Sequence, residues 1–317
     1  MSAFALAAVA CRPGGEAEPA EGASAAHEVP AAAVPAAPEA PQGPDTAAET
    51  DSETEAVALA NAAPAADPAA ADGAEAEVDV VAEPAPEPKD LIPDEPYKVL
   101  ILGDSLAATG FGAMLEKKLD AHPHVVCYRK GKSASGLARP DFFDWMGESK
   151  RQIEFRKPDL VVVIMGGNDG QDLTRLHGKK RVHWNKDDWP VAYRERMDKF
   201  LGEVVDDDRK VLWLGLPHMG LRSLEKKLVL IRGIQAEAVA ALGDGNTYVD
   251  TVPYTTTDEG ETLAMAAVGT RSKKKKIRAD DKIHFTMSGS EYFADRIYPD
   301  VLQALSLPDV EELEESK

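Results

Sequence analysis

Ser105 is the residue of this chain whose surroundings best suit a nucleophile. Val99–Leu102 is an uninterrupted apolar run, and Gly103-Asp104-Ser105 follows it directly. Such a run favours a strand buried on both faces, and the carboxyl ends of parallel strands meet at one edge of a sheet. We therefore expect Ser105 to lie where such sheets collect reactive side chains. The same pattern also describes an ordinary capped turn before a helix.

A serine hydroxyl barely ionises at neutral pH, so a base must take its proton before it can attack a carbonyl group. The segment Asp281-Lys282-Ile283-His284 offers both a base and a carboxylate to orient it. His284 would accept the proton, and Asp281 would hold the imidazole in the required tautomer. Asp280 is an alternative orienting acid, although the three-residue spacing favours Asp281. One loop could bring both groups to Ser105.

The negative charge that develops on an attacked carbonyl needs hydrogen-bond donors. Removing one such donor typically costs about 10²–10³ in rate. The backbone N–H groups of Ser105 and Gly136 and the side-chain amide of Asn168 could supply three donors, since each follows a predicted strand. Gly131 is a rival to Gly136 in the same loop. In isolation, Asn168 could equally be a turn-forming residue.

These segments are separated by a regular alternation of strands and helices. We predict strands near 99–102, 124–128, 159–165, 210–217 and 247–250, and helices near 107–121, 141–155, 190–205, 223–242 and 288–305. Strands that alternate with helices form a parallel sheet covered on both faces. We expect one domain over residues 97–305, followed by an acidic C-terminal tail at 306–317.

The segments also resemble the four sequence blocks of the SGNH (GDSL) hydrolase superfamily, in the superfamily's order. The matching residues are 103–106, 136, 166–169 and 281–284. The resemblance implies a flavodoxin-like three-layer α/β/α sandwich with a five-stranded parallel sheet. It also implies ester chemistry without a cofactor or metal, with Ser105 as nucleophile, His284 as base and Asp281 as orienting acid. Gly136 and Asn168 would complete the oxyanion hole with Ser105.

Three further residues are candidates for the substrate pocket. Arg139 and Trp145 lie in the loop after Gly136, a loop that is similar to one in a bacterial branch of the superfamily. His218 follows the fourth predicted strand at its carboxyl end, so it could face the site. Aromatic residues at such a spacing are more often part of the core, and His218 could have a structural role instead.

The acidity of the chain belongs to its N-terminal part. Residues 1–96 contain 20 Asp and Glu against 2 Lys and Arg, whereas residues 97–317 contain 35 against 34. No Phe, Trp or Tyr occurs from Gly15 to Glu95, so we expect residues 12–96 to be a disordered Ala/Pro/Glu-rich linker. The charge balance argues against nucleic acid as a partner.

Residues 1–11 are similar to a bacterial lipoprotein signal, with Cys11 as the lipidated residue. The resemblance implies an exported, lipid-anchored protein of the periplasm or cell envelope. The alternative is an unprocessed apolar end of the chain. Cys127, the other cysteine, lies in an apolar run and is expected to be a buried, inert thiol. No cysteine-based metal site is therefore expected.

The favoured function is hydrolysis of an ester in a small molecule or an envelope glycan. One alternative is an O-acyltransferase of envelope polysaccharide or peptidoglycan that uses the same triad. Another is a catalytically silent glycan-binding domain, which an intact set of reactive residues disfavours. Lys273–Lys276 is predicted to be a solvated surface loop, with a patch that attracts an anionic envelope polymer as the alternative.

Overall fold

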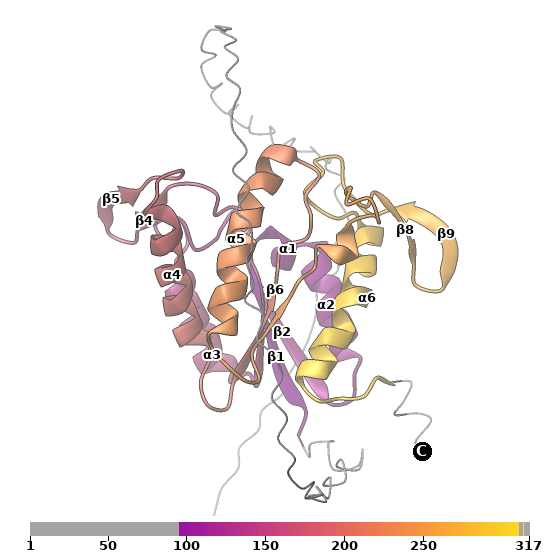
Figure 1. Ribbon diagram of the computed structural model, residues 1–317. Coiled ribbons are helices and arrows are strands. Elements are labelled where there is room, and N and C mark those ends of the chain that lie inside the picture. The colour runs from indigo at the N-terminus through magenta and orange to yellow at the C-terminus, as the bar shows by residue number, and fades with distance from the viewer. Residues whose placement is uncertain (1–94, 311–312, 314–317) are drawn as a thin grey trace, which may run out of the picture. The chain divides into compact units, whose positions relative to one another are not determined.

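The structure is a computed structural model that describes residues 95–310 and residue 313 (Figure 1). The expected lipoprotein signal with Cys11, the expected linker as far as residue 94, and residues 311–312 and 314–317 lie outside the described residues. The elements are β1 (Tyr97–Gly103), α1 (Ser105–Ala108), α2 (Gly110–Asp120), β2 (Val125–Gly131), α3 (Trp145–Arg156), β3 (Leu160–Ile164), β4 (Leu173–Arg175), β5 (Gly178–Val182), α4 (Trp189–Val204), β6 (Lys210–Leu214), α5 (Arg222–Ala240), β7 (Thr247–Val249), η2 (Pro253–Thr255), β8 (Met265–Val268), β9 (Arg271–Lys276) and α6 (Met287–Ala304).

The central sheet has five parallel strands in the order β2-β1-β3-β6-β7. This is the doubly wound, flavodoxin-like order, so the predicted fold class is confirmed. Val99 of β1 pairs with Cys127 on β2 and with Leu160 on β3. Every residue of β3 is buried, as its run of β-branched and leucine side chains predicts. Cys127 is also buried, and burial raises the pKa of its thiol, which keeps it unreactive.

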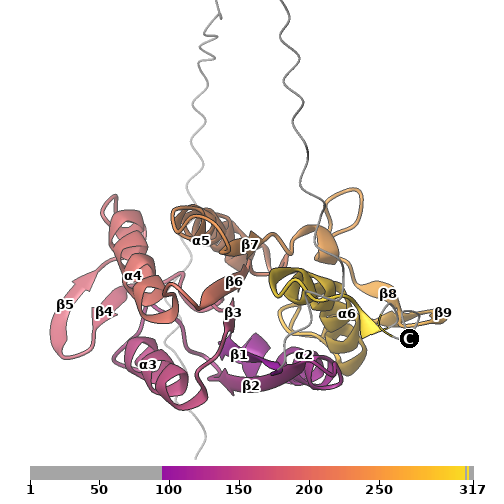
Figure 2. The same ribbon diagram turned by 90° about the horizontal axis from the view of Figure 1, so that it is seen from below.

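Helices cover both faces of the sheet, which gives three layers (Figure 2). Helices α3, α4 and α5 lie on one face, and α2 and α6 lie on the other. Phe111 on α2 packs against Phe293 on α6, with 4.6 Å between the ring centroids. On the opposite face, Phe200 of α4 meets Trp213 of β6 edge to face. Burial of these aromatic side chains fixes both layers on the sheet.

Chain ends and boundaries differ from the prediction in two places. The helix predicted at 107–121 is broken at Thr109, where the backbone is extended between α1 and α2. At the other end, Leu307 is buried beyond the expected boundary at Leu305, and the Pro308 carbonyl lies 3.1 Å from Nε2 of the buried His122. The packed core therefore includes residues that follow α6.

No helix in the described part of the chain has the length and apolar character needed to cross a bilayer.

Two antiparallel hairpins, β4–β5 and β8–β9, extend the fold beyond the predicted elements. The expectation that Lys273–Lys276 forms a loop is wrong, because these residues belong to strand β9. Their side chains are mostly exposed, as expected for a solvated run. The strand forms because its partner β8 buries Ala266 and Val268. A run of lysines alone gives no sign of that pairing.

Candidate active site

Ser105 is the first residue of α1, immediately after β1. The turn before it is tight: a Cβ on Gly103 would collide with the Ile164 carbonyl of the neighbouring strand β3. Asp104 caps the helix, since its carboxylate accepts a hydrogen bond from the Leu106 N–H at 3.0 Å. The apolar strand and the capped turn together place Ser105 at the carboxyl edge of the sheet.

His284 links Ser105 to Asp281 through both of its ring nitrogens. Its Nε2 lies 2.8 Å from the Ser105 Oγ, and its Nδ1 lies 2.6 Å from Oδ2 of Asp281. A carboxylate can only accept, so the shared proton is on Nδ1 and the Nε2 lone pair faces the serine hydroxyl. This is the geometry of a nucleophile, a base and an orienting acid. Asp280 instead pairs with Lys276 at the surface, which leaves Asp281 as the acid that contacts His284.

The loop that carries Asp281 is fixed by its own hydrogen bonds. Oδ1 of Asp281 accepts from the N–H groups of Ile283 and His284, both at 2.9 Å. Burial raises the pKa of the Asp281 carboxyl, but the hydrogen bonds from the His284 ring and from these two amides outweigh it and lower that pKa to about 2. Asp281 is therefore a carboxylate at any physiological pH.

Arg278 holds this loop against the segment that follows β6. Its guanidinium donates to the carbonyls of Ile283, at 2.8 Å, and His218, at 2.5 Å. The same group lies over the Phe285 ring, 4.2 Å from its centroid. Burial lowers the pKa of Arg278 to about 10, so it stays charged. Sequence reasoning missed this residue, because both of its partners are backbone oxygens.

Asn168 faces the same cavity as Ser105. Its Nδ2 donates to the carbonyl of Ser135 at 3.0 Å. An amide nitrogen carries two hydrogens, so one remains for a substrate oxygen. The predicted role of Asn168 as an oxyanion donor is compatible with this placement.

Gly136 is buried, and a Cβ there would collide with the Asp169 carboxylate. A Cβ on its rival Gly131 would collide with the backbone of Ala108. From the same loop, Ser133 and Ala134 line the cavity with Ser105. The assignment of Gly136 to the oxyanion hole stays a prediction. Sequence reasoning did not single out Ala134, whose φ of 60° is unusual for a residue with a side chain.

Asp169 is the residue that fixes this loop, a role that its place in the third sequence block does not indicate. Its buried carboxylate accepts from the N–H groups of Leu137, at 3.1 Å, and Ala138, at 2.8 Å. The hydroxyl of Tyr193 on α4 donates to it at 2.8 Å. Burial raises the pKa of the Asp169 carboxyl, although these hydrogen bonds act to lower it. The carboxylate therefore ties the loop after β2 to the turn that carries Asn168.

The cavity beside Ser105 has a volume of about 590 Å³. Asp281, His284 and Ser105 together form a hydrogen-bonded relay, and the last two contribute a polar part of the cavity wall. Phe285 and the exposed Met287 form an apolar part. It is lined by Ser105, Thr109, Gly110, Ser133, Ala134, Asn168, His284, Phe285, Met287 and Ser290. An apolar wall next to a nucleophile suits the acyl part of an ester.

The three predicted pocket residues do not line this cavity. Trp145 is buried and donates from Nε1 to the Ser135 hydroxyl at 2.9 Å, so it braces the loop from within the core. Arg139 pairs with Asp141 and lines a separate cavity. His218 lies 2.8 Å from the Thr262 hydroxyl through Nδ1 and lines another. Each side chain has another partner: Ser135 for Trp145, Asp141 for Arg139 and Thr262 for His218, and a position after a strand end does not reveal that partner.

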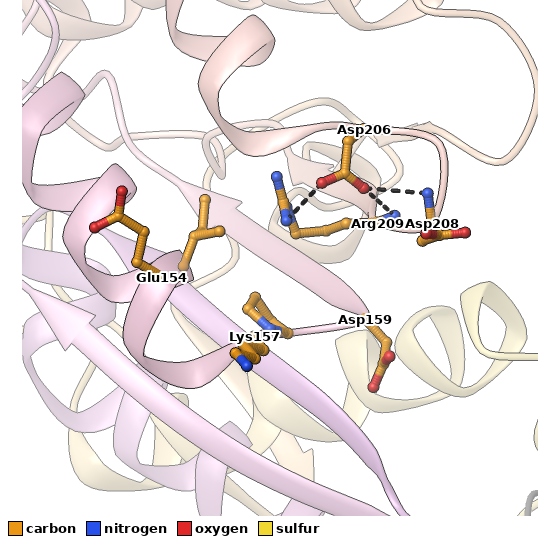
Figure 3. Close-up of a pocket in the computed structure, with 8 residues that line it drawn as sticks. Glu154, Lys157, Asp159, Asp206, Asp208 and Arg209 are labelled. Carbon is orange, nitrogen blue, oxygen red and sulfur yellow. Dashed lines mark hydrogen bonds and ion pairs between the residues drawn. The ribbon is translucent and has the colours of Figure 1, made fainter.

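A further cavity of about 500 Å³ lies at the amino ends of β3 and β6, the opposite edge of the sheet (Figure 3). Its charged side chains include Glu154, Lys157 and Asp159, together with Asp206, which bonds to Arg209. None of the relay residues lies there. Within the described residues, no group of three or more His, Cys, Asp or Glu side chains is arranged to hold a metal ion.

Asp104 gives the site a dependence of stability on pH. Burial raises the pKa of its carboxyl to about 6, even though the amides of Leu106 and Gly167 donate to it. Between about pH 4 and pH 6, the Asp104 carboxyl is therefore protonated in the folded protein and ionised in the unfolded chain. As pH rises from 3.5 to 7, we expect the unfolding free energy to fall by about 3 kcal/mol through this group.

Urea unfolding of the wild-type chain and of Asp104→Asn across this pH range measures the effect. The difference in unfolding free energy between the two proteins should shift by that amount in favour of the variant as pH rises. A difference that is constant with pH would show that Asp104 ionises in the folded state as it does in the unfolded chain.

A family model and several solved structures are similar to this chain. Residues 98–300 match the family described as "Protein of unknown function (DUF459)". The chain belongs to the DUF459 family. In this DUF459 member, the first, third and fourth blocks that resemble those of SGNH hydrolases meet around Ser105. No curated protein matches the chain.

Several solved structures are similar to this DUF459 chain. A lipase/acylhydrolase from Enterococcus faecalis is 16% identical, with a TM-score of 0.47, over 65% of this chain and 95% of its own. A catalytic mutant of an acetylxylan esterase from Geobacillus stearothermophilus is 14% identical, with a TM-score of 0.46, over 68% and 96%. A GDSL-like lipase from Bacteroides thetaiotaomicron VPI-5482 is 14% identical, with a TM-score of 0.44, over 68% and 90%.

Proposed function

We propose that this DUF459 protein is a serine ester hydrolase that removes O-acyl groups, with Ser105 as its nucleophile. The observation that carries the proposal is the unbroken chain of contacts from Asp281 through His284 to the Ser105 hydroxyl, which opens into a cavity with an apolar wall. A serine that only began a helix would not need an oriented imidazole at its Oγ. The intact relay also disfavours a domain that only binds glycans.

In the acylation step, the Ser105 Oγ attacks the carbonyl carbon of the ester while Nε2 of His284 takes the hydroxyl proton. The Asp281 carboxylate stabilises the resulting imidazolium. The tetrahedral intermediate collapses, the bond to the alcohol oxygen breaks, and His284 donates the proton to the leaving alcohol. Water, deprotonated by the same imidazole, then attacks the acyl carbon. The bond from that carbon to the Ser105 Oγ breaks, His284 returns the proton to Oγ, and the carboxylic acid is released.

Three donors are proposed for the oxyanion: the N–H groups of Ser105 and Gly136 and the Nδ2 of Asn168. Asn168→Ala removes the side-chain donor, so we expect kcat to fall by about 10²–10³ while KM changes little. Steady-state hydrolysis of p-nitrophenyl acetate measures both constants. Thermal unfolding of the variant controls for the lost bond to Ser135. A well-folded Asn168→Ala protein with wild-type kcat would remove Asn168 from the oxyanion hole.

The substrate that we propose is an O-acylated glycan of the cell envelope. The support is the N-terminal sequence, because a lipid on Cys11 followed by a long Ala/Pro/Glu-rich segment would hold the domain at a membrane surface. Expression of the full chain and of Cys11→Ser in a bacterium tests the anchor. The native chain should sediment with membranes until detergent is added, whereas equal amounts of both proteins in the soluble fraction would contradict it.

Release of free acetate from an O-acetylated envelope glycan tests the reaction itself. Acetate should appear in water without any added acceptor, and Ser105→Ala should release none. Acetate that appears only when a glycan acceptor is present as a co-substrate would instead indicate acyl transfer through the same acyl-enzyme. Absence of turnover on glycans and on small esters alike would contradict the proposed hydrolase.

A further inference from the structure

The hairpin of β8 and β9 carries a concentration of positive charge. Arg271 and Lys273–Lys276 occupy five of the six positions of β9, and no Asp or Glu occurs from Met265 to Lys276. Acidic and basic residues are nearly balanced over residues 97–317 as a whole, so this excess is local. Neighbouring like charges repel one another, and the run therefore weakens the hairpin that carries it.

The hairpin is attached to the fold by other residues. Ala266 and Val268 of β8 are buried together with Ile277 and with Tyr292 of α6. Figures 1 and 2 show the two strands projecting beside α6. Of the five cations, Lys276 alone forms an ion pair within the described part of the chain, with Asp280, which is 96% exposed. The charges of β9 are thus available to a partner in solution.

The C-terminal end of β9 is hydrogen-bonded to the segment that lines the active-site cavity. Thr286 donates from its hydroxyl to the Lys276 carbonyl, at 2.6 Å, and from its N–H to the Ile277 carbonyl, at 3.0 Å. Arg278 and Phe285 then form a β-bridge. Phe285 and the adjacent His284 both line the cavity of Ser105. A ligand bound along β9 therefore ends beside the reacting groups.

We propose that β9 binds a linear polyanion, and that the ester cleaved at Ser105 is carried by this polymer. The inference rests on the proposed hydrolase function and specifies its substrate class. Successive residues of a strand are about 3.3 Å apart, so the five cations extend over about 17 Å. A small anion would contact one or two of them, whereas a chain with regularly spaced carboxylates or phosphates would contact several of them at once.

Two triple variants of the full-length protein separate the effect of the hairpin lysines from the effect of the protein's net charge. The hairpin variant is Lys273→Gln/Lys274→Gln/Lys275→Gln. The control variant is Lys117→Gln/Lys150→Gln/Lys199→Gln, which changes the net charge equally at exposed lysines on α2, α3 and α4. The substrates are O-acetylated polygalacturonate, O-acetylated glucomannan as a neutral polymer, and p-nitrophenyl acetate.

For the hairpin variant at low salt, we expect KM for acetylated polygalacturonate to rise about 10-fold with kcat unchanged. Its constants for the neutral polymer and for p-nitrophenyl acetate should equal those of the wild-type protein, and the control variant should behave as wild type on all three. Equal losses in both triple variants, or wild-type KM in the hairpin variant, would overturn the proposal.

Binding without turnover keeps this inference separate from the hydrolase proposal. Ser105→Ala should bind polygalacturonate or long-chain polyphosphate with an affinity that falls with salt, and the tighter of the two identifies the preferred anion. Adding the three hairpin substitutions should make the slope of log K against log salt clearly less steep, because fewer counterions are released on binding. If the polymer binds through the hairpin but no ester is hydrolysed by the wild-type protein, the hydrolase proposal is contradicted and the polyanion site is not. If the hairpin substitutions leave binding unchanged, the polyanion site is contradicted.

Discussion

Ser105→Ala should abolish ester hydrolysis, with kcat lowered by at least about 10⁴-fold. The alanine removes the only atom that forms the acyl-enzyme, and it leaves the cavity and the bond between His284 and Asp281 in place. Turnover of p-nitrophenyl acetate by the purified full-length chain measures the loss. Ser105 is at a helix start, and among the described residues its hydroxyl is hydrogen-bonded to His284 alone, so we expect thermal unfolding to change little.

Ser133→Ala is the matched control for this substitution. Ser133 lines the same cavity, but within the described residues its side chain forms no hydrogen bond with Ser105, His284 or Asp281, so its loss should leave kcat within about twofold of wild type. Hydrolysis by Ser105→Ala at the wild-type rate would exclude this serine as the nucleophile and would remove the basis of the proposed mechanism.

His284→Ala should lower kcat nearly as much as Ser105→Ala. Without the imidazole, the part of the chain that the structure describes offers no other base within hydrogen-bond distance of the Ser105 Oγ. Residues that act as a unit are not additive, so Ser105→Ala/His284→Ala should be no slower than either single variant. Kinetics of the three proteins on one small ester measure this directly.

His183→Ala is the control, since His183 pairs with Asp172 at an exposed position outside the cavity. It should retain wild-type kcat. A different result would be that His284→Ala lowers kcat in the Ser105→Ala background by the same factor as in the wild-type background. That result would show that the two residues act independently, which contradicts the relay.

The parallel sheet and most of the relay could be predicted because their signals are local in sequence. Leu160–Ile164 is apolar at every position and mostly β-branched, which favours a strand buried on both faces. Each of the three turns that meet at the site directly follows a strand or opens a helix. Asp281 and His284 are three residues apart, so their pairing needs no knowledge of the rest of the fold.

The parts that could not be predicted depend on contacts between distant segments. Trp145 follows the second block at a spacing that would suit a pocket, but the Ser135 hydroxyl and the core accommodate it instead. Arg278 binds two carbonyl oxygens, which every residue offers, so no sequence pattern marks it. The β9 strand is polar, and its pairing is determined by the apolar face of β8.

Covalent labelling of the full-length chain with a fluorophosphonate tests the central claim most directly. The Ser105 Oγ should attack phosphorus, its proton should pass to His284, and fluoride should leave. Mass spectrometry of the digested protein should then find one adduct, on the peptide that contains Ser105, and none in Ser105→Ala. A wild-type chain that remains unlabelled, or an adduct that persists in Ser105→Ala, would contradict the account.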